Sequence, residues 1–123
     1  MTGAETQWGT AAMLAGLREA GYTVHETNGF AVFDYDIEVG PRSGQSVKVG
    51  LQLIEDWPLS APGGPQVSPP LGHPHGAVHP SPLGAGWEYW SRPASQWASD
   101  RSVRGYLRHL RTLFAQLHAE AAA

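Results

Sequence analysis

The chain has 123 residues, of which 41% are hydrophobic and 15% charged, and its formal net charge at pH 7 is −3. A chain of this length and composition is expected to bury a core of its own, and its small negative charge gives no general attraction to nucleic acid or to an anionic membrane. No cysteine is present, which excludes disulfides and thiolate chemistry, and the lack of a signal-peptide pattern or a membrane-length apolar run predicts a cytoplasmic protein.

The first half of the chain predicts one helix and three strands. Apolar side chains at helical spacing indicate an amphipathic helix over residues 10–21. Asn28-Gly29 lies between two β-prone runs and predicts a hairpin turn. Alternation over 31–39 and again over 47–53 predicts half-buried antiparallel strands, and Lys48 is expected opposite the acidic face of the preceding strand. These elements form a β-meander.

Residues 58–86 are much richer in proline than the residues before them. Eight of the ten prolines lie between residues 58 and 82, so extended, irregular backbone is expected there. The phrase "PQVSPP" at 65–70 is interpreted as a short edge strand. A disordered linker would have a similar composition, but the aromatic run from Trp87 to Trp90 that follows favours an ordered loop.

The last element is a helix predicted over 100–119, with Ser99 or Asp100 as its cap. One side of this helix carries an arginine stripe, which is either a solvated face or a dock for an acidic partner. The predicted fold class is therefore α+β: an N-terminal helix, an antiparallel meander of three to four strands, a long ordered loop rich in proline and tryptophan, and a C-terminal helix.

The order of these predicted elements and several short sequence motifs resemble the ubiquitin-conjugating enzyme (UBC) fold. The family has an N-terminal helix before a meander, then an acidic–aromatic–proline phrase, a histidine–proline dipeptide, and a tryptophan and proline before a helix. The matching residues are Asp56-Trp57-Pro58-Leu59, Pro62, Pro69-Pro70, His73-Pro74, His79-Pro80, Trp90, Pro93 and Trp97. The resemblance covers about residues 10–117. The phrase "GWEYWSRPASQW" also looks like divergent prokaryotic relatives that work beside a ubiquitin-like protein, its activating enzyme and an isopeptidase.

One departure from the family pattern limits what the resemblance implies. Conjugating enzymes carry their cargo on a cysteine thioester, and this chain has no cysteine. Serine at Ser81 or Ser91 would form only a less reactive oxyester, and the family's asparagine after histidine–proline is replaced by His75 or Ser81. The resemblance therefore implies a non-catalytic binding or scaffold protein of a prokaryotic ubiquitin-like conjugation pathway. An alternative is a conjugating enzyme whose cysteine has been replaced, for example at Ala85.

The resemblance also implies partners and contact residues. A single UBC-like domain is expected over 1–123, with frayed ends at 1–9 and 119–123. It would bind a ubiquitin-like protein, its activating enzyme or a catalytic conjugating partner, without a cofactor. Family analogy places those contacts on the first helix and sheet and on the 73–97 loop. The candidate residues are Met13, Leu17, Arg18, Trp87, Tyr89, Trp90, Arg92 and Trp97. An interaction domain with no link to ubiquitin would share the same fold features.

Three loop histidines suggest a second class of function. His73, His75 and His79 have spacings that suit a Zn²⁺ site or histidine acid–base chemistry. The nearest acidic residue after them is Glu88, so a fourth ligand is not close in sequence. The competing interpretation is that the histidines satisfy the backbone of an ordered loop.

The aromatic residues have two interpretations as well. Trp57, Trp87, Tyr89, Trp90 and Trp97 either fix irregular backbone onto the sheet or form an exposed platform for a partner. Each buried indole contributes roughly 2–3 kcal/mol of apolar burial, which favours the structural role.

Overall fold

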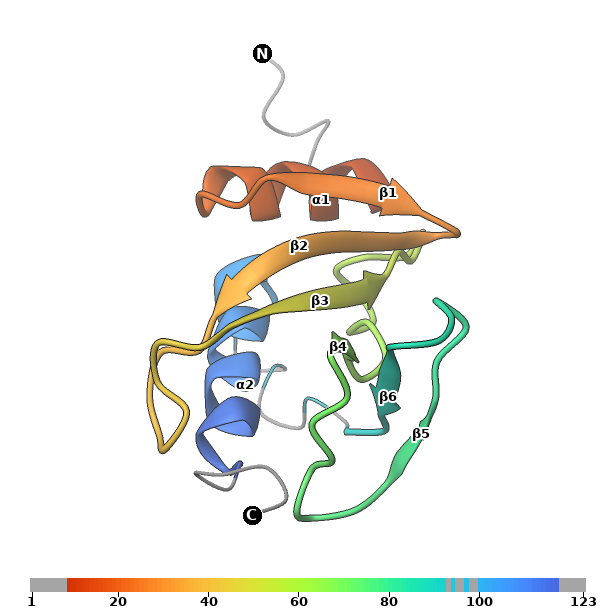
Figure 1. Ribbon diagram of the computed structural model, residues 1–123. Helices are drawn as coiled ribbons and strands as arrows, with labels where there is room; N and C mark the ends of the chain where they lie inside the picture. Colours follow the sequence, from red (N-terminus) through yellow and green to blue (C-terminus); the bar gives the residue numbers. More distant parts are fainter. Residues whose placement is uncertain (1–8, 93, 95–96, 98–99, 118–123) are drawn as a thin grey trace.

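The computed structural model describes residues 9–92, 94, 97 and 100–117, and its fold is α+β. Within this part of the chain, a six-stranded antiparallel sheet has the order β1-β2-β3-β4-β6-β5. Figure 1 shows α2 behind the sheet and α1 beside β1 at the top. The elements are α1 (Gly9–Glu19), β1 (Val24–Thr27), β2 (Phe30–Asp36), β3 (Ser46–Gln52), β4 (Gln66–Ser68), β5 (Val78–Pro80), β6 (Glu88–Trp90) and α2 (Val103–Ala115).

The predicted meander is confirmed. Asn28 and Gly29 both have positive φ angles, 51° and 82°, which is the backbone that a tight hairpin turn requires. β1 pairs with β2, and β2 with β3, in continuous register. Lys48 lies opposite Asp34, and its Nζ is 2.8 Å from Asp34 Oδ1. The alternating pattern thus specifies both the register and the face of these strands.

The core lies between the sheet and the two helices. Side chains from one face of β2, β3 and β4 meet those of α1 and α2, as strand alternation requires. Tyr35 and Phe114 have ring centroids 5.2 Å apart, and Phe114 is 5.1 Å from Trp90. The most deeply buried large side chains are Trp90, Tyr35, Tyr106, Phe33, Phe114, Met13, Leu17, Ile37 and Leu110.

The predicted strand count and the predicted edge strand were wrong. Six strands are described rather than three to four, because β5 and β6 lie inside the segment expected to be a loop, in addition to the short strand expected at 65–70. β4, from the phrase "PQVSPP", is not an edge strand: it lies between β3 and β6. Its prolines are tolerated because they flank the three paired residues Gln66–Ser68 rather than interrupt them.

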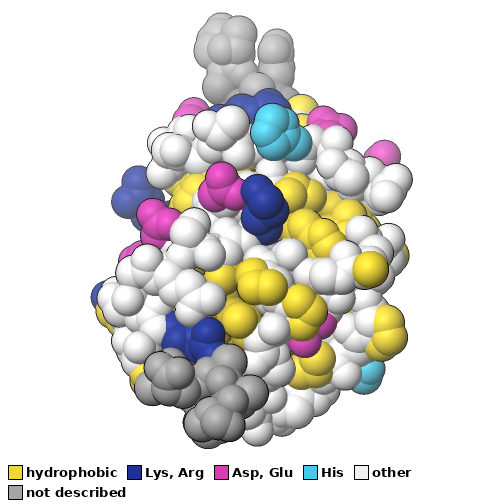
Figure 2. Space-filling view, viewed as in Figure 1, with side chains coloured by type: hydrophobic (Ala, Val, Ile, Leu, Met, Phe, Trp, Pro, Cys, Tyr) yellow, Lys and Arg dark blue, Asp and Glu magenta, His cyan; other side chains and the backbone are white. Residues whose placement is uncertain are grey.

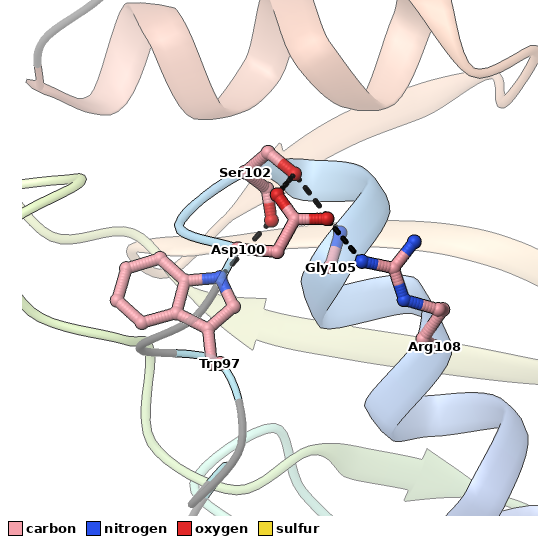
Figure 3. A network of polar contacts seen from close by, with 5 residues as sticks. All are labelled: Trp97, Asp100, Ser102, Gly105 and Arg108. Carbon is pink, nitrogen blue, oxygen red and sulfur yellow. Dashed lines mark hydrogen bonds and ion pairs between the residues drawn. The ribbon is translucent and has the colours of Figure 1, made fainter.

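The starts of both helices differ slightly from expectation. α2 begins at Val103, and its cap is Ser102, whose Oγ accepts a hydrogen bond from the Gly105 N–H at 3.0 Å. Asp100 supports the cap: it accepts from the Ser102 hydroxyl and pairs with Arg108 (Figure 3). The other predicted cap, Ser99, lies outside the described residues. α1 begins at Gly9, whose N–H donates to the Trp57 carbonyl, so Gly9 is not part of a frayed end as predicted. The other residues predicted to fray, 1–8 and 119–123, lie outside the described residues.

Candidate binding surface

The proline-rich segment, residues 58–92, is called the flap below. Its backbone is fixed largely by side chains, and the central one is Glu88 on β6. Glu88 is 8% exposed, and its Oε2 accepts hydrogen bonds from Leu71 N–H and Gly72 N–H at 2.7 Å each. The same oxygen accepts from Trp90 Nε1 at 2.8 Å. A single buried carboxylate therefore satisfies three donors and ties the backbone at residues 71–72 to β6.

Trp90 and His73 join the flap to α2. Trp90 is fully buried, with its indole 4.9 Å from the His73 ring in an edge-on arrangement. His73 is 4% exposed, and its Nε2 lies 3.1 Å from the carbonyl oxygen of Leu113, near the end of α2. The Leu113 carbonyl, which also accepts from the Gln116 N–H at 3.2 Å, thus has a second contact that comes from a distant loop.

The start of the flap is held in the same way. The Tyr106 hydroxyl on α2 donates to the Gly63 carbonyl at 2.8 Å. Gly64 passes so close to β6 that a Cβ atom there would lie 1.7 Å from the Trp90 carbonyl oxygen. Only glycine fits at this crossing. The two ends of the flap are therefore packed against each other and against α2.

The flap also covers part of the sheet's outer face, the face away from α2. Leu83, in the connection between β5 and β6, lies over Gly50: a Cβ atom on Gly50 would be 2.8 Å from Leu83 Cδ1. Tyr89 and His79 are paired across β6 and β5, with ring centroids 5.9 Å apart. Figure 2 looks onto this side of the molecule and shows hydrophobic side chains gathered across its middle.

A hollow of about 560 Å³ opens beside Tyr89 and is called the Tyr89 hollow. Its remaining lining residues are Ala61, Pro62, Gly63, Gly64, Ser91, Arg92 and Ala94. An aromatic ring, a guanidinium group and glycine backbone therefore surround one open space. Such a combination suits a protruding side chain or a short stretch of a partner, with the cation favouring an acidic group.

The structure separates the predicted contact residues into two groups. Met13, Leu17, Trp90 and Trp97 are at most 6% exposed and belong to the core, so their predicted contact with a partner is corrected to a packing role. Tyr89 and Arg92 are half-buried and line the same hollow. Trp87 is half-buried in the flap, and Arg18 is exposed on α1, where it donates to the Val24 carbonyl at 3.2 Å.

The family landmarks also lie in defined places. Trp57 is 4% exposed, and its ring centroid is 5.3 Å from that of Trp97. Pro58 borders an open groove between α1 and the start of α2. His79 and Pro80 are exposed residues of β5. The structural interpretation of the aromatics thus holds for Trp57, Trp90 and Trp97, whereas Tyr89 keeps an accessible edge.

The three loop histidines do not converge on one point. His73 is buried with both ring nitrogens hydrogen-bonded, His75 is exposed, and His79 packs on Tyr89. Among the residues that the structure describes, no group of three or more metal-ligating side chains could hold an ion. Burial, the largest cause, lowers the pKa of His73 below its ordinary value, while its bond to the Leu113 carbonyl raises it.

Sequence reasoning missed Glu88 and Tyr106 as the residues that fix the flap. The only local signal was a carboxylate within the aromatic run Trp87-Glu88-Tyr89-Trp90, since a charge flanked by large apolar side chains is expected to need a buried partner. Tyr106 gave no such signal, because its position on the helix is equally consistent with ordinary packing.

The chain matches no family model, no curated protein and no solved structure. In the described part of the chain, neither helix has the length and apolar character needed to cross a membrane.

Proposed function

We propose that the chain is a cysteine-free, UBC-like binding protein that acts in a prokaryotic ubiquitin-like conjugation pathway. Its partner is a ubiquitin-like protein, the activating enzyme of that protein, or a catalytic conjugating subunit. The observation that carries this proposal is the order helix, antiparallel meander, side-chain-fixed flap, helix, in a chain without cysteine.

The geometry favours binding over catalysis. His73 is committed to backbone groups on both nitrogens, and Glu88 Oε2 already accepts three hydrogen bonds. Neither group is available as a general base for a substrate. The accessible features are instead an aromatic edge and a hollow, which are features of a recognition surface.

We infer that the partner contacts the Tyr89 hollow and the adjoining outer face of the sheet. Tyr89 supplies a rigid aromatic edge, and Arg92 supplies a cation from a backbone position held close to Gly64. A preorganised surface loses little conformational entropy on binding, so a modest contact area gives useful affinity. The flap's side-chain anchors provide that preorganisation.

The test is affinity capture from the native host, followed by titration calorimetry with the captured protein. The wild type is expected to recover a ubiquitin-like protein, an activating enzyme or a conjugating subunit. Tyr89→Ala is expected to weaken binding about tenfold or more, as loss of an aromatic anchor does. Ser91→Trp, which fills the Tyr89 hollow, is expected to abolish binding.

The matched control is Ala11→Trp, which adds the same indole to an exposed position on α1. This variant is expected to bind as the wild type does. Recovery of none of the three protein classes would contradict the pathway. Wild-type affinity in Ser91→Trp would contradict the proposed surface.

A further inference from the structure

Two histidines join the flap to α2 from opposite sides. His73 on the flap places Nε2 3.1 Å from the Leu113 carbonyl oxygen, while its Nδ1 accepts the His75 backbone N–H at 3.2 Å. A nitrogen that accepts a hydrogen bond carries no proton, so the single ring proton is on Nε2. The observed contacts therefore require a neutral imidazole.

His109 faces the flap from α2. Its ring is 5.3 Å from that of Tyr106, and burial lowers its pKa while the Arg92 backbone acts in the opposite direction. Its Nε2 is buried and has no hydrogen-bond partner in the described structure. Protonation would place an N–H and a positive charge where no acceptor is present, which is costly in a buried site.

The groups that face His73 act in both directions on its protonation, and the Arg92 guanidinium and the His75 ring oppose it. The Arg92 guanidinium, which donates to the Gly76 carbonyl, lowers the pKa of His73, and the His75 ring acts in the same direction. Glu88 is the carboxylate of the nearby strand β6, and its Oε2 is occupied by three donors. At the end of α2, the Leu113 carbonyl and the side chain of the C-cap residue Gln116 favour the charged form of His73. Arg111 on the same helix pairs with Glu38.

We propose that His73 and His109 form an acid-sensitive latch: both imidazoles are neutral when the flap is closed on α2, and their protonation releases residues 71–92 from the helix. This device acts on the conformation of the flap and does not depend on which partner the protein binds. Because the Tyr89 hollow is built partly from the same segment, opening would also disassemble that surface.

The direction of the pH effect follows from linkage. Burial is the largest cause of the lowered pKa at both His73 and His109, against an ordinary value of 6.5. An opened flap restores ordinary values, so the open state binds more protons over the interval between the two. Closure is therefore fully favoured above about pH 6.5 and is lost as the pH falls below that value toward the lower pKa of the closed state.

Hydrogen exchange read by mass spectrometry at pH 7.5 and at pH 5.5 tests the latch on the whole chain, after correction for intrinsic exchange rates. Residues 71–92 and the last turn of α2 are expected to exchange several-fold faster at pH 5.5 than at pH 7.5, because the open state binds more protons than the closed state at the lower pH. Amides of β2 and β3 are expected to keep their protection, so the opening is local.

The test variant is the double substitution His73→Asn with His109→Gln, which removes both titrating groups and keeps polar side chains. Its flap protection is expected to be the same at both pH values. The matched control His79→Asn, an exposed residue of the same flap, is expected to retain the wild-type pH response. If the double variant leaves the flap open at every pH, a second measurement on the wild type replaces it. The pH midpoint of the His73 ring, measured by NMR, must then coincide with the midpoint of flap opening measured by hydrogen exchange.

Three results would overturn the latch. These are a wild-type flap that stays protected at pH 5.5, a double variant that still opens with acid, or a simultaneous loss of protection in β2 and β3. In the last case the acid effect would be global unfolding.

Discussion

The hairpins of β1 to β3 and the flap are stabilised by different means. β2 and β3 pair over seven residues, and their alternating side chains enter the core. β4, β5 and β6 have only three residues each. In the flap, buried side chains instead take the hydrogen bonds that a longer ladder would have made, with Glu88, His73 and Tyr106 each bonded to a distant backbone group.

This difference shows where each region is vulnerable. In the meander, the loss of one side chain leaves the backbone ladder intact, because neighbouring pairs still hold the register. In the flap, the Glu88 side chain holds the N–H groups of Leu71 and Gly72, which have no second partner among the described residues, and burial makes an unpaired polar group expensive. Single substitutions should therefore separate the two regions in stability measurements.

The largest effect is expected for Trp90→Ala. The indole is fully buried, contacts His73 and Phe114, and donates to Glu88. Its removal leaves a cavity and takes away one of the three donors to Glu88 Oε2, so the free energy of unfolding should fall by about 3–5 kcal/mol. Chemical denaturation measures this value. Leu59→Ala, at an exposed apolar side chain of the flap (59% exposed), should change stability by less than about 0.5 kcal/mol.

The second-largest loss in the free energy of unfolding is expected for Glu88→Ala. Leu71 N–H, Gly72 N–H and Trp90 Nε1 lose their acceptor together, and the expected loss is about 3 kcal/mol. Glu88→Gln keeps one carbonyl oxygen at this position and should lose about half as much. Equal stability of the wild type and Glu88→Ala would contradict the assigned role. Glu55→Ala, which removes an exposed carboxylate, serves as the control.

Tyr106→Phe tests a single tertiary hydrogen bond. The substitution keeps the buried ring and removes only the hydroxyl that donates to the Gly63 carbonyl. Thermal denaturation should show a stability loss of about 1 kcal/mol. Hydrogen exchange should rise first around residues 61–64. A uniform increase across the sheet would indicate that the hydroxyl does not act on the flap specifically.

The smallest effect is expected in the meander. Lys48 and Asp34 form an ion pair whose side chains are 59% and 73% exposed. Because exposed pairs are screened by solvent, Lys48→Ala should change the free energy of unfolding by less than about 0.5 kcal/mol. A double-mutant cycle with Asp34→Ala isolates the pair. A coupling above about 1 kcal/mol would show that the meander also relies on individual side-chain contacts.

The meander could be predicted because its signals are local. Asn28-Gly29 specifies the turn, and alternation over seven residues specifies each face. β4 to β6 could not be predicted with their order, since three residues are too few to show a period. Their pairing depends on close approaches such as Gly64 against Trp90, which no local pattern encodes.

The candidate surface was predictable only in part. The sequence identified Tyr89 and Arg92 as candidates but placed them in one set with Trp90 and Trp97, which are buried. Composition cannot distinguish an aromatic residue that anchors a loop from one that faces outward, because the same residue types serve both roles. Whether each of these side chains is buried depends on the alternation along β6. β6 can be identified as a strand only from its pairing with β4 and β5.

The most direct test of the flap's construction is native-state hydrogen exchange at pH 7.5, read by NMR at single amides. The amides of Leu71 and Gly72, bonded only to the Glu88 side chain among their described partners, should be protected to within about tenfold of the Val49 amide in β3. Exchange of Leu71 and Gly72 at the rate of an unstructured peptide, with Val49 still protected, would contradict a flap fixed by buried side chains.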